Sequence, residues 1–205
     1  MRTEIAIEGV QTRNSIPPWA CGLTGKTIAL LALFGLLAGL NRGFCAETSL
    51  TEYQVKSLFL LNFAKYIDWP TNAFEATNAS IVIAVIGEGK FAGDLAKAVD
   101  GKSVDRRPIL VRQIQTPEDF DKCHILFVRA SEKTGLAEIL ARLKTRPVLT
   151  VGEADQFMEQ GGMINFVKKE GKVRLEINLE AARQANLQIS SKLLNVADVV
   201  KGKSK

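Results

Sequence analysis

The sequence contains few of the residues from which active sites and metal centres are built. Its 205 residues include one histidine and three cysteines, and no G-x-S-x-G motif of a serine hydrolase occurs. Cys123 directly precedes His124, and neighbours on a strand point to opposite faces, so these two side chains cannot form a nucleophile–base pair. One Cys and one His also make no zinc ligand set. We therefore predict no enzyme activity, no metal and no cofactor.

Aromatic side chains and runs of like charge are also scarce. The chain has two Trp, two Tyr and a formal net charge of +5, with no block of basic residues. Surfaces that bind nucleic acid need clustered Lys and Arg together with aromatic rings for stacking. We therefore predict that no nucleic acid is a partner.

The N-terminal part has one long apolar run, and it is short for a membrane span. Residues 27–40 read TIALLALFGLLAGL, which is 14 residues, whereas about 20 are needed to cross a bilayer. This length fits the core of a secretory signal peptide, with cleavage after Ala46 or Cys45. We predict a signal peptide over 1–46 and an exported, periplasmic domain over 47–205. An uncleaved membrane anchor is the alternative. The exported domain keeps one cysteine, Cys123, and so has no internal disulfide.

Apolar periodicity divides the exported part into helices and strands. An apolar stripe predicts a helix over 51–67, and Asp68-Trp69-Pro70 ends it. Strands over 81–86, 108–114, 124–130 and 148–152 alternate with helices over 90–99, from Thr116, from Ser131 to about 144, and over 153–159. Strands 163–169 and 172–179 follow, joined by a turn at Glu170-Gly171, and then helices 179–186 and 190–200. We predict one α/β domain with a mostly parallel central sheet, helices on both sides and a C-terminal antiparallel hairpin.

A glycine-rich turn follows the first strand and raises the question of nucleotide binding. The stretch IVIAVIGEGKFAG has Gly87, Gly89 and Gly93, one residue too long for the Rossmann spacing. The acid that binds the ribose of a dinucleotide belongs at the C-terminal end of the second strand, but Asp105 precedes that strand. The P-loop pattern also fails, because Lys90 is followed by Phe91 and not by Ser or Thr. The glycines are better explained by a tight strand-to-helix turn.

Three stretches together resemble the YfiR-like family of periplasmic proteins. They are VKSLFLLNFAKYIDWP at 55–70, IVIAVIGEGKFAGDL with RRPILVRQI, and the C-terminal run that includes INL and SSKLL. The likeness covers nearly all of 51–200. It implies a regulator without enzymatic activity that binds the periplasmic domain of an inner-membrane diguanylate cyclase, inhibits it and lowers cyclic di-GMP. It further implies a homodimer and sequestration by an outer-membrane lipoprotein. The namesake joins a thiol near the place of Cys123 to a first-strand cysteine, which this chain lacks.

The outward face of the last hairpin strand is the predicted partner surface. Arg174 and Glu176 are the expected polar contacts, and Ile164 on the preceding strand is the expected apolar anchor; the resemblance places family interface residues near Ile164 and Glu176. Alternatively, Arg174 and Glu176 only solvate an exposed sheet face. The alternative function is a small-molecule sensor that binds at the C-terminal ends of the parallel strands. Gly87, Gly89 and Arg106 or Arg107 would line that crevice. A scaffold subunit of a membrane signalling complex is a third possibility.

Overall fold

The computed structural model describes residues 50–200, apart from 116–119, 121 and 132–134. The chain divides into two units, Met1–Thr48 and Ser49–Lys205, and only the second is described here. The predicted signal peptide, the helix from Thr116 and the first residues after Ser131 lie outside the described residues. In the part that is described, no helix has the length and apolar character needed to cross a bilayer.

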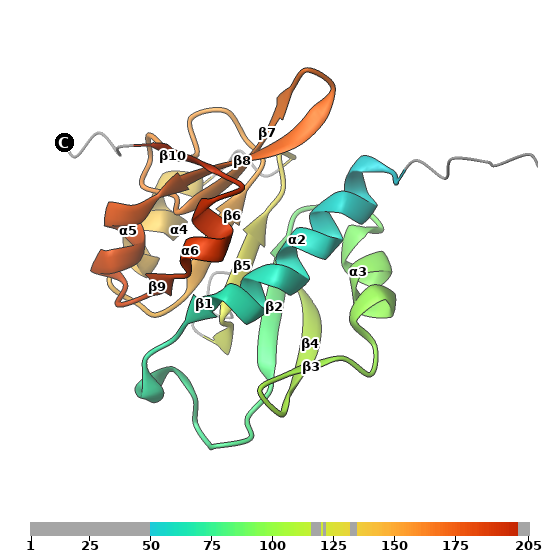
Figure 1. Cartoon of the computed structure of the whole chain (residues 1–205), viewed down its shortest axis with the longest axis vertical. Helices are drawn as coiled ribbons and strands as arrows, with labels where there is room; N and C mark the ends of the chain where they lie inside the picture. Colours follow the sequence, from blue (N-terminus) through green and yellow to red (C-terminus); the bar gives the residue numbers. More distant parts are fainter. Residues whose placement is uncertain (1–49, 116–119, 121, 132–134, 201–205) are drawn as a thin grey trace, which may run out of the picture. The chain divides into compact units, whose positions relative to one another are not determined.

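A mostly parallel sheet forms the centre of the domain, as predicted, and with the short strands β3 and β10 it has eight strands among the described residues (Figure 1). Its strand order is β10-β8-β7-β6-β5-β2-β4-β3. The five strands from β7 through β6, β5 and β2 to β4 run parallel, whereas β7 with β8 and β3 with β4 are antiparallel. The strands are β2 (Ile81–Ile86), β3 (Ser103–Val104), β4 (Arg107–Ile114), β5 (Ile125–Val128), β6 (Leu149–Gly152), β7 (Ile164–Lys169), β8 (Lys172–Asn178) and β10 (Asp198–Val200).

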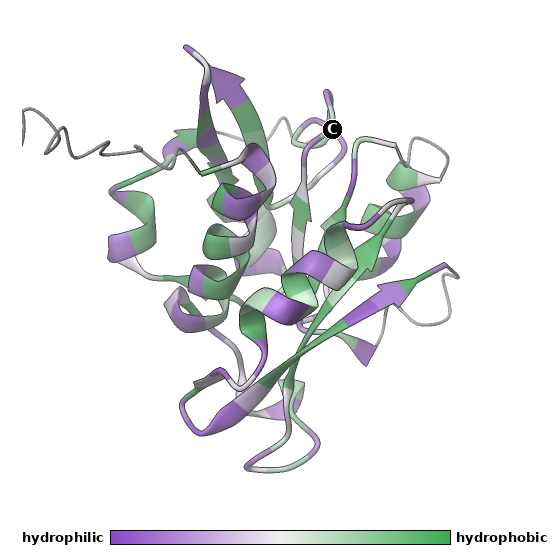
Figure 2. Ribbon diagram, turned by 90° about the vertical axis from the view of Figure 1, so that its right-hand side faces the viewer, coloured by the Kyte–Doolittle hydropathy of each residue, from purple (hydrophilic) through white to green (hydrophobic). Residues whose placement is uncertain are grey.

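Helices cover both faces of this sheet, which confirms the predicted fold class. On one face lie α2 (Glu52–Tyr66), α3 (Phe91–Val99), α5 (Leu179–Gln184) and α6 (Ser191–Leu194), and α4 (Leu136–Leu143) lies on the other. Alternate residues of the central strands feed two separate cores. Ile83 and Val85 of β2 pack toward α2 and α3, while Val82 and Ala84 pack on the α4 side. The central strands are therefore hydrophobic along their length (Figure 2), as expected for a parallel sheet.

The first helix is fixed at its start by its own side chains. Thr51 and Gln54 form a capping box, in which the Thr51 hydroxyl accepts from the Gln54 N–H and the Gln54 side chain accepts from the Thr51 N–H. Phe63 of α2 stacks on Phe166 of β7, with ring centroids 6.0 Å apart. The apolar residues of this helix were all predicted to be buried, but Leu58 is 47% exposed, whereas the polar Lys56 and Ser57 are buried.

Two predicted helices differ from the structure. Residues 153–159 form turns, because the Phe157 ring packs against Gly152 and Gly162 and brings the chain back within a few residues. The predicted helix over 190–200 is only α6, followed by β10, which hydrogen-bonds in parallel with β8. Before α6, β9 (Gln188–Ile189) pairs with β1 (Ile67–Asp68), which follows α2. Thus β10 pairs with β8 at the edge of the sheet, and β9 pairs with β1 after α2. The local sequence indicates neither of these short strands.

His124 attaches the 69–80 loop to the beginning of the parallel strands. Its Nδ1 accepts from the Val82 N–H at 3.1 Å, and its Nε2 lies 3.1 Å from the Ala73 carbonyl oxygen. These partners define a neutral ring that is protonated on Nε2. Phe74 stacks on the ring at 4.5 Å, and the Arg107 guanidinium lies 3.7 Å above the Phe74 centroid. His124 is therefore a buried structural histidine.

Acid should destabilise the fold through His124. Burial lowers the pKa of His124 below its ordinary value of 6.5; the bond to the Ala73 carbonyl opposes this shift, and the charge of Arg107 adds to it. Because the unfolded chain binds the proton more readily, the contribution is complete above about pH 6.5 and is lost as the pH falls toward the folded-state pKa. Urea unfolding at pH 7.5 and 5.5 should show a larger loss for the wild type than for His124→Gln. Equal losses in both proteins would contradict this role.

Candidate functional site

An α/β sheet of this kind commonly binds ligands at its topological switch point, which here lies at the carboxyl ends of β2 and β5. From β2 the chain moves outward to β4 and then returns to the other side of β2 as β5, so the direction of strand order reverses there. The turn after β2 has φ values of +114° at Gly87 and +108° at Gly89, which L side chains rarely adopt. The glycines are therefore required by the backbone of the turn.

Arg129, directly after β5, fills the space that this turn leaves. A Cβ atom on Gly87 would lie 2.8 Å from Arg129 Cβ, and one on Gly89 would lie 2.7 Å from Arg129 Nη1. Arg129 Nη2 donates to the Tyr53 hydroxyl of α2 at 2.8 Å. A guanidinium of the protein itself thus lies against the glycine turn, where a nucleotide-binding relative of this fold would hold a phosphate.

A buried ion pair continues from Arg129 to the first helix. Glu153, directly after β6, contacts Lys56 Nζ at 2.6 Å through one oxygen, and the other accepts from the Ala130 N–H at 3.1 Å. The Lys56 and Glu153 side chains are only 7% and 8% exposed. Lys56 also binds Glu52 at 2.6 Å, and Arg129 Nε lies 3.8 Å from Glu153. Four charged side chains therefore connect α2 to the carboxyl ends of β5 and β6.

The charge network keeps Lys56 protonated despite its burial. Burial by itself lowers the pKa of the Lys56 ammonium, but its bonds to Glu153 and Glu52 outweigh this, and the net shift is upward. The bond from Lys56 in turn lowers the pKa of Glu52, and burial opposes this shift. A lysine held in its charged form has no lone pair for nucleophilic or base chemistry. The arrangement is suited to fastening α2 to the sheet.

Sequence reasoning did not single out the members of this network. Arg129 and Glu153 each directly follow a buried strand, and the carboxyl ends of parallel strands meet at one edge, so their positions were a usable signal. Lys56 carried no such signal, because it lies within an apolar helix stripe. Among the described residues, no group of three His, Cys, Asp or Glu side chains is placed to hold a metal ion.

The predicted ligand crevice is not assembled as expected. Arg107 begins β4 and donates to the Ala76 and Ala79 carbonyls, beside the start of β2. Gly87 and Gly89 follow the other end of β2. Because β2 and β4 are parallel, Arg106 and Arg107 lie at the opposite edge of the sheet and cannot line one crevice with the glycines. Cys123 and His124 likewise have different neighbours: the Cys123 thiol is buried and donates to the Phe120 carbonyl at 3.2 Å.

The predicted partner residues have different exposures. Arg174 is exposed and Glu176 is half-buried, on the face of β8 that points away from α2. Ile164 pairs with Ile177 across the hairpin and is fully buried in the α2-side core. This corrects the expectation of an exposed apolar anchor at Ile164, because its side chain packs inside the domain. Of the three residues, only Arg174 and Glu176 present side-chain surface to a partner.

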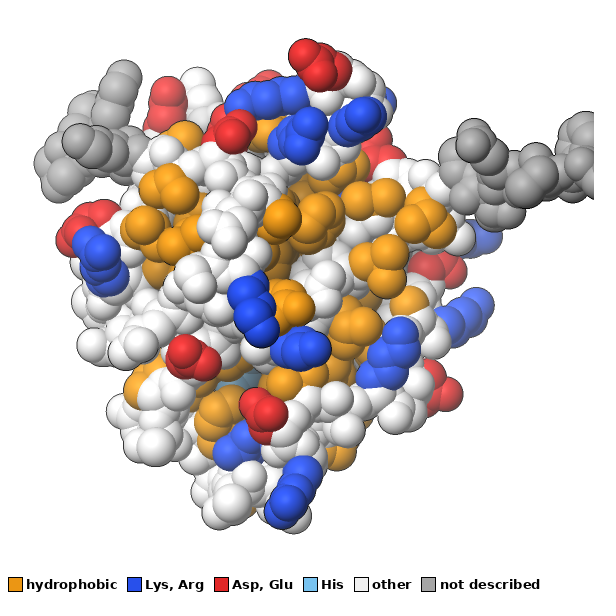
Figure 3. Space-filling view, viewed as in Figure 1, with side chains coloured by type: hydrophobic (Ala, Val, Ile, Leu, Met, Phe, Trp, Pro, Cys, Tyr) orange, Lys and Arg blue, Asp and Glu red, His pale blue; other side chains and the backbone are white. Residues whose placement is uncertain are grey.

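The hairpin that carries these residues has a strongly charged outer end. Lys169 binds Asp198 of β10 at 2.8 Å and Glu176 at 3.4 Å, and so connects three strands. Lys172 and Arg174 form no close ion pair within the described chain, although the charge of Arg174 acts on Asp198 in addition to the bond from Lys169. Charged side chains gather at the top of Figure 3, where Figure 1 places the β7–β8 hairpin. The turn at Glu170 and Gly171 has φ of +52° and +73°, as a tight two-residue hairpin requires.

The comparisons with known proteins agree with the sequence resemblance. The model of the YfiR/HmsC-like family matches residues 53–198, which is most of the chain, and the chain therefore belongs to this family. Membership indicates a regulatory protein of diguanylate cyclase signalling. No curated protein matches the chain significantly.

A solved structure of an ABC domain in complex with L-Trp, from Streptococcus pneumonia, is 12% identical, with a TM-score of 0.43. The match covers 58% of this chain and 55% of that one. A likeness at this level carries no argument about function.

The close approach of Arg129 to Gly87 predicts that alanine is tolerated less well at Gly87 than at Gly93, which has no neighbour in its way. Gly87→Ala should destabilise the fold by about 2 kcal/mol, because the new methyl group meets Arg129 and the backbone has positive φ. Gly93→Ala should be neutral or stabilise by about 0.5 kcal/mol, because it lies in α3 with open space around it. Chemical denaturation of both variants checks the pair, and equal stabilities would contradict the packing of Arg129 into the turn.

The Lys56–Glu153 pair predicts a strong energetic coupling. Lys56→Met should cost about 3 kcal/mol, because it leaves Glu153 buried with only the more distant Arg129. Glu153→Gln in the same chain should recover part of that loss. Urea unfolding of both single variants and the double variant measures the coupling. Lys97→Met, at an exposed position of α3, is the control and should change stability by less than about 0.5 kcal/mol. Additive effects of Lys56→Met and Glu153→Gln would show that the pair is not coupled.

Proposed function

We propose that this protein is a non-enzymatic periplasmic regulator that binds the sensor domain of an inner-membrane diguanylate cyclase and inhibits it. The observation that carries this proposal is the family match over residues 53–198. Binding of this kind lowers cyclic di-GMP, because the inhibited cyclase makes less of it. An N-terminal signal peptide would bring the domain to the compartment of the sensor domain.

The geometry at the two ends of the central strands favours a binding role over a catalytic one. Arg129 lies against the glycine turn at the switch point, and Lys56 and Glu153 hold α2 beside it. The His124 cluster covers the start of β2 at the opposite edge. The small-molecule sensor considered from sequence would need the crevice that Arg129 occupies. A partner is therefore better sought on the outer surface of the domain.

The outward face of β8 is the proposed contact surface. Arg174 is exposed and has no ion-pair partner in the described part of the chain, and Glu176 is held by Lys169. Both side chains point to the same face, because they are two residues apart on a strand. Within the same proposal, the protein forms a homodimer and is sequestered by an outer-membrane lipoprotein, which relieves the inhibition.

Glu176→Arg should weaken inhibition and leave the fold intact. Replacing Glu176 removes a partly exposed ion pair, which contributes about 1 kcal/mol or less, and Lys169 keeps Asp198. Across an interface the reversed charge opposes binding more strongly. Cyclic di-GMP is measured in cells in which the variant replaces the wild-type chain, and it should rise.

The matched control is Glu138→Arg, the same charge reversal on the exposed side of α4. It should leave cyclic di-GMP unchanged. Capture of the cyclase from detergent-solubilised membranes by the purified wild-type chain, with weaker capture by Glu176→Arg, tests the contact directly. Equal capture and equal cyclic di-GMP with both variants would remove β8 from the proposed interface.

A further inference from the structure

A groove of about 480 Å³ lies between α2 and α3 at the surface of the domain. The two helices meet near their beginnings, where the ring centroids of Tyr53 and Phe91 are 5.5 Å apart. Beside this contact, Leu58 and Leu61 of α2 form one wall, and α3 with the residues after it forms the other. The volume is within the usual range of small-molecule sites. None of the described residues that line the groove belongs to β8, so it is separate from the proposed partner surface.

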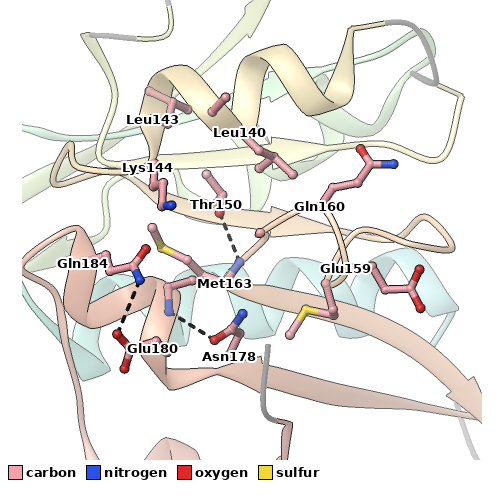
Figure 4. A pocket seen from close by; sticks show the side chains of 14 residues that line it. Leu140, Leu143, Lys144, Thr150, Glu159, Gln160, Met163, Asn178, Glu180 and Gln184 are labelled. Carbon is pink, nitrogen blue, oxygen red and sulfur yellow. Dashed lines mark hydrogen bonds between the residues drawn. The ribbon is translucent and has the colours of Figure 1, made fainter. Parts of the chain in front are cut away.

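Exposed apolar side chains are concentrated at this groove. Six large apolar residues are strongly exposed among the described residues, and three of them line it. They are Leu50, Tyr53 and Leu58, with exposures of 53%, 45% and 47%. Figure 3 shows hydrophobic side chains over the region where Figure 1 places α2 and α3. Contiguous apolar surface of this kind is typical of binding sites. By contrast, the pocket in Figure 4, between α4 and α5, is lined by Glu159 and Glu180 as well as Lys144.

The polar side chains that α2 contributes to the groove are already bonded within the helix. Ser57 is 8% exposed, and its hydroxyl donates to the Tyr53 carbonyl at 2.9 Å. Thr51 and Gln54 bond to each other in the capping box. An occupant that lies along α2 therefore meets leucine side chains and polar groups that already have partners. Such a wall suits a hydrocarbon chain.

The charges of the groove favour an anion. The ammonium groups of Lys97 and Lys102 line it against one carboxylate, that of Asp94. Both lysines are exposed, and neither forms an ion pair in the part of the chain that the structure describes. Lys97 is in the last turn of α3, and the Lys102 N–H donates to the Val99 carbonyl at 2.9 Å, whereas Asp94 is in the first turn. Positive charge is thus gathered where α3 ends, beside the apolar wall.

We propose that this groove binds one fatty acid. Its carboxylate lies at the ammonium groups of Lys97 and Lys102, and its alkyl chain lies along Leu50, Leu58 and Leu61. A single negative charge fits best, because Asp94 opposes a head group with a second one. The binding test needs no partner protein, so its outcome is independent of the proposed regulatory function.

Isothermal titration calorimetry of the purified chain with decanoate tests the proposal. Saturable binding at one site per chain is expected. Butyrate has the same head group and a shorter chain, and decyltrimethylammonium has the same chain and the opposite charge; each should bind at least about tenfold more weakly. No saturable binding of decanoate, or equal binding of either control ligand, would overturn the proposal. Tighter binding of decyl phosphate than of decanoate would overturn the assignment to a fatty acid.

Variants separate the contributions of charge and chain. Lys97→Gln with Lys102→Gln should weaken decanoate binding about tenfold or more and leave decyltrimethylammonium binding no weaker. Leu58→Gln should weaken decanoate binding at least about fivefold, because it removes apolar contact with the chain. All three positions are exposed, so the variants should fold, and circular dichroism checks this. Lys172→Gln and Leu110→Gln are matched controls at exposed positions outside the groove. Wild-type affinity in both groove variants would overturn the proposed site.

A second copy of the chain is the other occupant that an apolar groove of this size could take. Size-exclusion chromatography with light scattering measures the mass of the wild type and of Leu58→Gln. Equal masses are expected if the groove holds a fatty acid. A smaller mass for Leu58→Gln, together with no decanoate binding by the wild type, would assign the groove to the second copy and overturn the proposal.

Discussion

The buried pair of Lys56 and Glu153 is the interaction on which the arrangement of this domain depends. It joins the first helix to the carboxyl ends of the central strands, and Arg129 completes it from β5. Two charges at 2.6 Å with almost no exposure are stable only while each has its partner, because removal of one leaves the other desolvated. The pair acts together with the apolar side of α2, where Phe63 stacks on Phe166 of β7 in the same core.

The same contact determines which parts of the molecule remain available for binding. Arg129 is held against Gly87 and Gly89 by Tyr53 and Glu153, so the crevice typical of this architecture contains a side chain of the protein itself. At the other edge, His124 and its aromatic neighbours hold a loop over the start of β2. Charged surface is left on the β7–β8 hairpin.

Much of the fold could be predicted because its elements have strong local signals. The apolar run 81–86 and the alternation of Val173, Leu175 and Ile177 correctly predicted β2 and β8. Glu170-Gly171 correctly predicted the hairpin. The errors occurred where tertiary contacts outweigh local preference. Phe157 fills the space beside two glycines and turns the chain where a helix was expected, and residues 198–200 join the edge of β8 as a strand.

The sequence by itself determined the α/β class, the hairpin and the family, because periodicity and short motifs are properties of neighbouring residues. It also indicated that Gly87 and Gly89 are turn glycines. Only the tertiary structure decided that Arg129 fills their turn and that Ile164 is a core residue. It also decided that Arg107 lies at the opposite end of the parallel strands from Gly87 and Gly89. These facts depend on residues far apart in the chain, such as Tyr53 with Arg129 or Lys56 with Glu153. Their proximity results from how the helices pack on the sheet, and no local pattern records it.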